Sequence, residues 1–193
     1  MPESAPGDRW VAVCGPPRAL AEVEHRLLDL GRRAGGAVEV VTHVVRVPEG
    51  NHHAGTLRVR GPAAADGWAE PGEAVVVCDE DGEVLLAGDP GHRDHAVAAV
   101  RAHRARASGR LVRFPGQDAL PDVLPLGELT GRCAVEAVDL LGVADDPGLV
   151  LRTRGHVRPQ FRDGVVVLPV TAWDDGEVCP FEGPRPRACC SDH

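Results

Sequence analysis

Short valine-rich runs, separated by glycine, proline and acidic turn residues, constrain the fold of this chain more than any other feature of its sequence. Runs of this length and composition predict β-strands. The sequences DEDG (79–82) and Asp163-Gly164 each join two such runs directly, which indicates hairpins. A sheet built from hairpins is antiparallel. The predicted strands are residues 9–14, 38–47, 56–60, 74–78, 83–87, 111–114, 150–161 and 165–170.

Three further segments have the apolar spacing of helices, namely residues 16–33, 93–107 and 132–141. They do not alternate regularly with the strands, as the helices of a doubly wound parallel sheet do. We therefore expect an α+β fold, with a mostly antiparallel sheet, about three helices packed on it, and a Cys-rich C-terminal tail. In the first helix the apolar stripe consists of Leu20, Val23, Leu27 and Leu30.

The 193 residues suit one ordinary domain or two small ones. We expect a disordered lead over residues 1–8, a single α+β domain over 9–175, and a Pro/Cys-rich tail over 176–193. Two stretches rich in glycine and proline, 61–72 and 115–131, are either long loops or a subdomain boundary. The domain prediction places the break, if there is one, at 61–72.

The composition excludes several classes of enzyme. The chain has no lysine and no tyrosine, and all 21 of its basic side chains are arginines. It therefore has no lysine for a phosphate-binding loop, a Schiff base or a pyridoxal phosphate anchor. None of its three serines lies in a G-x-S-x-G motif, which argues against a serine hydrolase of that type.

The net charge of −8 argues against nucleic acid and anionic membranes as partners, because both attract positively charged surfaces. The N-terminal residues lack the pattern of a signal peptide, and no apolar run approaches the ~20 residues of a membrane span. We therefore expect a cytoplasmic protein with reduced cysteines. The sequence does not determine its oligomeric state.

The C-terminal tail has the strongest metal-binding pattern in the sequence. Three cysteines and one histidine in fifteen residues are the ligand types that zinc and copper(I) prefer. We expect a metal site here, with zinc as the cofactor. The alternatives are a redox-active thiol pair and unliganded surface thiols. The predicted ligands are Cys179, Cys189, Cys190 and His193.

A second cluster lies in the sequence GDPGHRDH, at the start of the second predicted helix. His92 and His95 are three residues apart, so a helical turn would bring them to one face. Asp89 and Asp94 could bind the same metal or orient an imidazole. The alternative is that the aspartates cap the helix and that the histidines are solvated. His103, further along the same helix, is expected to be exposed.

Two other groups are candidates for ligand binding. His52 and His53 are adjacent in a predicted loop. Arg154, His156 and Arg158 would project from one face of a strand, where they suit a small anionic ligand. The alternative for both groups is an ordinary solvated surface.

The three remaining cysteines, Cys14, Cys78 and Cys133, follow apolar patterns and are expected to be core residues. The leading hypothesis is therefore a metal-binding protein that holds zinc through its C-terminal cysteines and histidine. One alternative is a small-molecule enzyme that uses the loop histidines and aspartates, with an Arg-flanked histidine for an anionic substrate. The other is a non-catalytic protein-interaction module.

Overall fold

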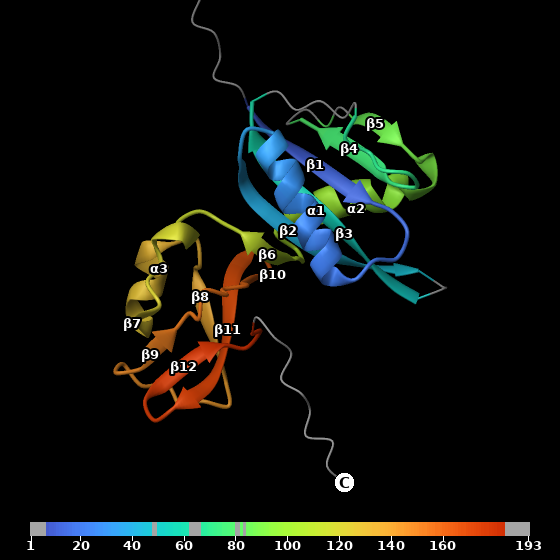
Figure 1. The fold of residues 1–193 in the computed structure, drawn as a ribbon. Helices are drawn as coiled ribbons and strands as arrows, with labels where there is room; N and C mark the ends of the chain where they lie inside the picture. The colour runs from blue at the N-terminus through green and yellow to red at the C-terminus, as the bar shows by residue number, and fades with distance from the viewer. Residues whose placement is uncertain (1–6, 48–49, 62–66, 80–81, 83, 184–193) are drawn as a thin grey trace, which may run out of the picture. The chain divides into compact units, whose positions relative to one another are not determined.

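The computed structural model describes residues 7–47, 50–61, 67–79, 82 and 84–183. It confirms the α+β fold, with a large, mostly antiparallel sheet and three helices (Figure 1). The chain divides into two compact units, Met1–Phe114 and Pro115–His193. The division lies at the start of the second loose stretch, 115–131, whereas 61–72 lies inside the first unit.

In unit 1 the strand order is β5-β4-β1-β3-β2-β6, and all neighbouring strands are antiparallel. Strand β1 lies inside the sheet, and its last four residues, Val11 to Cys14, are almost fully buried. The elements are β1 (Asp8–Cys14), α1 (Leu20–Arg33), β2 (Ala37–Val47), β3 (Gly50–Arg60), β4 (Ala74–Cys78), β5 (Val84–Gly88), the short 3₁₀ helix η1 (Pro90–His92), α2 (Arg93–Arg104) and β6 (Arg110–Arg113).

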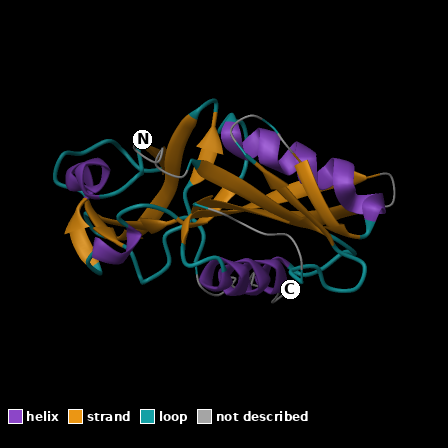
Figure 2. Ribbon diagram, turned by 90° about the horizontal axis from the view of Figure 1, so that it is seen from above, coloured by secondary structure: helices purple, strands orange, loops and turns teal. Residues whose placement is uncertain are grey.

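The sheet of unit 1 lies between its two helices, with α1 on one face and α2 on the other (Figure 2). Side chains alternate between the two faces along each strand. In β1, Val11 and Val13 pack with α1, whereas Ala12 and Cys14 pack with α2. The two faces of this sheet therefore carry two separate cores.

Gly55 on β3 allows α1 to approach the sheet closely. A Cβ atom at this position would lie 2.4 Å from the Cδ atoms of Leu27, a distance that carbon atoms cannot adopt. Leu27 is fully buried at this contact. A glycine is thus required in the middle of a strand that otherwise favours larger side chains.

Unit 2 is built around β11, which is antiparallel to β10 and β12 and parallel to β8. The hairpin predicted at Asp163-Gly164 is present between β10 and β11, and both turn residues have positive φ. The elements are the 3₁₀ helix η2 (Gln117–Ala119), β7 (Val123–Pro125), the 3₁₀ helix η3 (Leu126–Glu128), α3 (Leu129–Arg132), β8 (Ala137–Leu141), β9 (Val150–Arg152), β10 (Gln160–Arg162), β11 (Val165–Asp174) and β12 (Glu177–Pro180).

The helix predicted over 132–141 is wrong. Helix α3 ends at Arg132, and Ala137–Leu141 is a strand paired with β11. The sequence AVDLL suits either structure, and pairing with a strand distant in sequence decides between them. The predicted tail also begins differently, because its first residues form β12, where Val178 is fully buried.

None of the helices in the described ranges combines the length and the apolar character that crossing a membrane requires.

Candidate metal centre

Three side chains that can bind a metal converge at one end of β1. Cys14 is the last residue of β1, His92 is the last residue of η1, and His95 lies in the first turn of α2. One ligand atom of each lies within 4.8 Å of the other two. Among the described residues, this is the one group of three or more cysteine, histidine or acidic side chains with such geometry.

The local backbone explains this convergence. The Asp89 carboxylate accepts a hydrogen bond of 2.8 Å from the amide of Gly91 and so begins η1, as the alternative interpretation of this residue predicts. The Asp89 amide donates to the carbonyl of Glu73 at 2.7 Å. Gly88 makes this approach possible, because a Cβ atom there would lie 2.0 Å from the same carbonyl. The segment with both histidines is thus attached to the start of β4, beside the end of β1.

The three candidate ligands differ in burial. Cys14 is 1% exposed, and His92 and His95 are partly buried. Burial raises the pKa of the Cys14 thiol to about 11, and the charge of Glu73 raises it as well, against a hydrogen bond with the Gly15 backbone. A bound cation would provide the charge that this thiol needs in order to ionise. In a tetrahedral zinc site with the usual bond lengths, ligand atoms lie about 3.5 Å apart, so small side-chain rotations would bring these three into contact with one ion.

The sequence predicted part of this centre. It placed His92 and His95 together, and the structure brings them together. Asp94 points elsewhere, with its side chain 96% exposed. Cys14 was predicted as a core residue, and it is buried, but its sulfur also lies beside two imidazoles. No spacing in the sequence could reveal this, because strand β1 and the 3₁₀ helix meet only after folding.

His52 and His53 lie in strand β3 rather than in a loop, which corrects the prediction. Their backbones pair with Val45 and Val44 of β2. The side chain of His53 faces α1 and, together with Glu73 and other residues, lines a cavity of about 20 Å³, enough for a single water molecule. His53 and the pair His92/His95 thus belong to opposite faces of one sheet. The side chain of His52 lies outside the described part of the chain.

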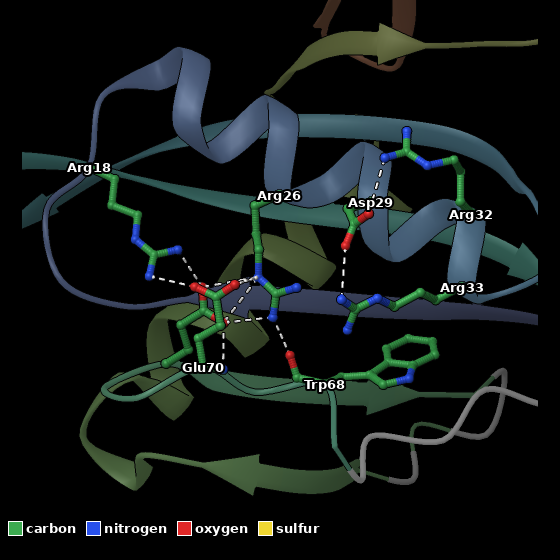
Figure 3. Close-up of polar contacts among 8 residues, drawn as sticks. Arg18, Arg26, Asp29, Arg32, Arg33, Trp68 and Glu70 are labelled. Carbon is green, nitrogen blue, oxygen red and sulfur yellow. Dashed lines mark hydrogen bonds and ion pairs between the residues drawn. The ribbon is translucent and has the colours of Figure 1, made fainter.

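A buried ion-pair cluster occupies the α1 face near this cavity (Figure 3). Arg18 and Arg26 bind the carboxylate of Glu73 at 2.6 and 3.0 Å. Arg26 also donates to the carbonyl of Trp68 and pairs with Glu70 at 3.2 Å. Burial raises the pKa of Glu73, but the hydrogen bond from Arg26 and the charges of both arginines outweigh it, so the net pKa is lowered. Two carboxylates balance two guanidiniums here, which leaves no excess charge for an anion.

A second buried network occupies the α2 face. His103 Nε2 lies 3.1 Å from Glu39, and His103 Nδ1 lies 2.8 Å from the hydroxyl of Thr56. The same hydroxyl lies 2.9 Å from His43 Nε2. Because an ionised carboxylate only accepts hydrogen bonds, His103 donates to Glu39. The Thr56 hydroxyl lies between the two imidazoles, as donor to one and acceptor from the other.

Burial has the largest single effect on the pKa values of His43 and Glu39 in this network. Burial, together with the charge of His103, lowers the pKa of His43 to about 3, so the imidazole is neutral in the folded protein. Burial raises the pKa of Glu39, but the hydrogen bond from His103 and the charge of Arg58 bring it below its usual value. His103 is 2% exposed, which corrects the prediction of an exposed residue. The hydroxyl of Thr56 is fully enclosed, so this network is not accessible to a substrate.

The candidate residues of unit 2 do not share a strand face, which corrects that prediction. Positive φ angles at Arg154 and Gly155 form a turn between β9 and β10. The guanidinium of Arg154 lies 4.6 Å from the ring centroid of Trp173. His156 lies 3.5 Å from Glu182, and Arg158 donates to the carbonyl of the preceding residue.

The C-terminal metal site stays a prediction. Cys179 is 1% exposed in strand β12, where it pairs with Thr171 of β11. The other three predicted ligands, Cys189, Cys190 and His193, lie outside the described residues.

No model of a protein family matches this chain, and neither does any curated protein or any solved structure.

Proposed function

We propose that this protein binds a transition-metal ion, with zinc preferred, through Cys14, His92 and His95. The observation that supports this proposal is the convergence of one sulfur and two imidazole nitrogens, from three separate elements, within 4.8 Å. Thiolate and neutral imidazole are the ligands that zinc prefers, and calcium and magnesium prefer oxygen.

Binding would have a structural consequence. The ion would connect the end of β1 to η1 and to the first turn of α2, two consecutive elements that lie far from β1 in the sequence. Such a site is complete only in the folded chain, so an ion that binds it stabilises the folded state by mass action. The proposed function is therefore metal-dependent stabilisation of the α2 face, with a metal centre at its edge.

The first test measures bound metal on the full chain, purified without a histidine tag and dialysed against buffered zinc. We expect one zinc ion per chain and a lower unfolding temperature after treatment with a chelator. Cys14→Ala should lose the ion. Cys78→Ala is the matched control, because Cys78 is also buried on the α2 face but lies in β4 opposite Trp10, away from the end of β1 that carries Cys14. A metal-free wild-type protein, or equal binding by both variants, would contradict the proposal.

The same measurement separates this centre from the predicted C-terminal site. A chain that ends at residue 183 lacks Cys189, Cys190 and His193. If the interior centre holds the ion, this shortened chain keeps one zinc and the same affinity. Loss of the ion on shortening would assign it to the C-terminal residues instead.

A further inference from the structure

We infer that four buried side chains of the α2 face form a proton relay, which takes up one proton from water and holds it on His103. The relay consists of Glu39, His43, Thr56 and His103. The inference goes beyond the proposed metal function and does not depend on it. It rests on three hydrogen bonds, two of which can reverse their direction together.

The Thr56 hydroxyl connects the two histidines of the relay. It lies 2.9 Å from Nε2 of His43 and 2.8 Å from Nδ1 of His103. The centroids of the two imidazole rings are 6.3 Å apart, so the hydroxyl joins rings that do not bond to each other directly. The relay ends at Glu39, which lies 3.1 Å from Nε2 of His103. All four residues are at most 6% exposed, so these hydrogen bonds are shielded from bulk water.

When His103 is neutral, every hydrogen bond of the relay has a fixed direction. The ionised Glu39 only accepts, so the single proton of His103 lies on Nε2. Nδ1 of His103 is then an acceptor, and Thr56 donates to it. The Thr56 oxygen in turn accepts from Nε2 of His43. This leaves a lone pair on Nδ1 of His43, an enclosed atom that has no hydrogen-bond partner among the described residues.

An added proton reverses the two hydrogen bonds of Thr56 and breaks neither. The proton enters on Nδ1 of His43, and the Nε2 proton of that ring passes to the Thr56 oxygen. The former hydroxyl proton passes to Nδ1 of His103. His103 is then an imidazolium that donates to both Thr56 and Glu39, and Thr56 donates to His43. His43 is neutral again, with its proton on Nδ1, and the relay has gained one proton.

The charges around the relay favour His103 as the place where the proton remains. Arg58 of β3 binds the carboxylate of Glu39 at 3.1 Å and that of Asp8 of β1 at 2.9 Å. Two carboxylates thus face one guanidinium, and an imidazolium at His103 balances the remaining negative charge. Its hydrogen bond to Glu39 then joins two charged groups, which strengthens it. The charge of His103 also lowers the pKa of His43, so the two rings do not become charged together.

The other titratable groups of the α2 face do not change this balance. Burial raises the pKa of the Cys14 thiol on β1 and of the Cys78 thiol on β4, so both are uncharged at neutral pH. Arg104 follows His103 on α2, but its guanidinium lies 4.8 Å from the ring centroid of Trp10.

The experiment follows each imidazole by nuclear magnetic resonance of the full-length protein with ¹⁵N-labelled histidine. The ¹⁵N signals report both the charge of a ring and which of its nitrogens carries the proton. Between about pH 8 and about pH 5, the range in which imidazoles titrate, we expect His103 to become charged. His43 should stay neutral and move its proton from Nε2 to Nδ1 with the same midpoint. Signals are assigned with His43→Gln and His103→Gln.

Three variants test the role of the hydroxyl. Thr56→Val removes it at similar volume, so His43 should lose the change of tautomer that accompanies the charging of His103. Thr56→Ser keeps a hydroxyl and should keep the coupled change. Thr42→Val is the matched control, because Thr42 is also buried but its hydroxyl bonds to the carbonyl of Arg110. It should resemble wild type.

The wild-type measurement can overturn the inference by itself, even if Thr56→Val does not fold. A tautomer of His43 that stays constant while His103 becomes charged would overturn it. So would a second proton on His43 in the same pH range, or a His103 that keeps one protonation state throughout. In a folded Thr56→Val protein, a coupled change equal to that of wild type would also overturn it, because the hydroxyl would then not connect the rings.

Discussion

The two faces of the unit 1 sheet bury polar groups in opposite ways. On the α1 face, the carboxylate of Glu73 is neutralised by guanidiniums, one of them from Arg26. On the α2 face, Glu39 accepts a hydrogen bond from a histidine, and His43 is a neutral imidazole. Guanidiniums stay charged throughout the pH range in which proteins fold, whereas imidazoles gain a proton in weak acid. We therefore expect the stability of the α1 face to depend on the presence of each charge, and the stability of the α2 face to depend on pH.

The largest effect is expected on the α1 face. In Glu73→Gln, Arg26 keeps its buried charge and loses its most buried partner, because the Glu73 side chain is 2% exposed. We expect a loss of about 3 to 5 kcal/mol in the free energy of unfolding, measured with urea. Glu70→Gln is the control, since Glu70 pairs with the same two arginines but is 48% exposed. Its substitution should cost less than about 1 kcal/mol. Equal losses in the two variants would show that burial does not set the strength of this cluster.

An intermediate effect is expected from acid on the α2 face. His43 has a folded-state pKa of about 3, below its ordinary value of 6.5, so between these values the unfolded chain binds the extra proton. Stability therefore falls as the pH decreases through this window, by about 1.4 kcal/mol per pH unit. The lowered pKa of Glu39 has the same sign, because its contribution is present above the unfolded pKa of 4.5 and is lost as pH falls through the folded value.

The variant His43→Leu separates these contributions. Urea unfolding of this variant at pH 6.5 and at pH 4.5 should show a difference smaller than that of wild type by about 2 to 3 kcal/mol. The comparison with wild type uses only this difference between the two pH values, because loss of the hydrogen bond to Thr56 lowers the stability of the variant at every pH. An unchanged pH dependence would show that His43 is protonated in the folded state.

The smallest effect is expected at the exposed end of α1. Asp29 pairs with Arg32 and Arg33 at 3.0 and 3.1 Å, and all three side chains are at least 36% exposed (Figure 3). Exposed pairs of this kind contribute little, because water screens them. Asp29→Asn should change the free energy of unfolding by less than about 0.5 kcal/mol. A loss as large as that of Glu73→Gln would show that the contrast between buried and exposed pairs does not hold for α1.

Local signals explain which parts of the fold were predictable. The hairpin at Asp163-Gly164 needs positive φ at both residues, and this sequence provides it. The apolar stripe of α1 could be predicted because the spacing of its apolar residues alone defines a buried helix face. By contrast, AVDLL at Ala137–Leu141 has no preference strong enough to decide its structure, and only its partner β11 makes it a strand.

The polar sites were less predictable, for a related reason. His103 follows Ala96, Ala99 and Val100 at helical spacing, so its burial could have been predicted from the sequence. Its partners on β2 and β3 were not, because they come from strands that the sequence alone does not place beside α2. The candidate metal centre shows the same limit, since His92 and His95 are near in sequence and Cys14 becomes their neighbour only in the folded sheet.

Glu73 contributes to both faces of the unit 1 sheet, and this has a consequence for its evolution. Its side chain serves α1 on one face, and its carbonyl accepts the hydrogen bond from Asp89 that holds the histidine segment on the other. Every residue type keeps the carbonyl that Asp89 needs, but only an acid at this position also neutralises the buried charge of Arg26. Natural variation at position 73 should therefore be narrower than at the more exposed position 70.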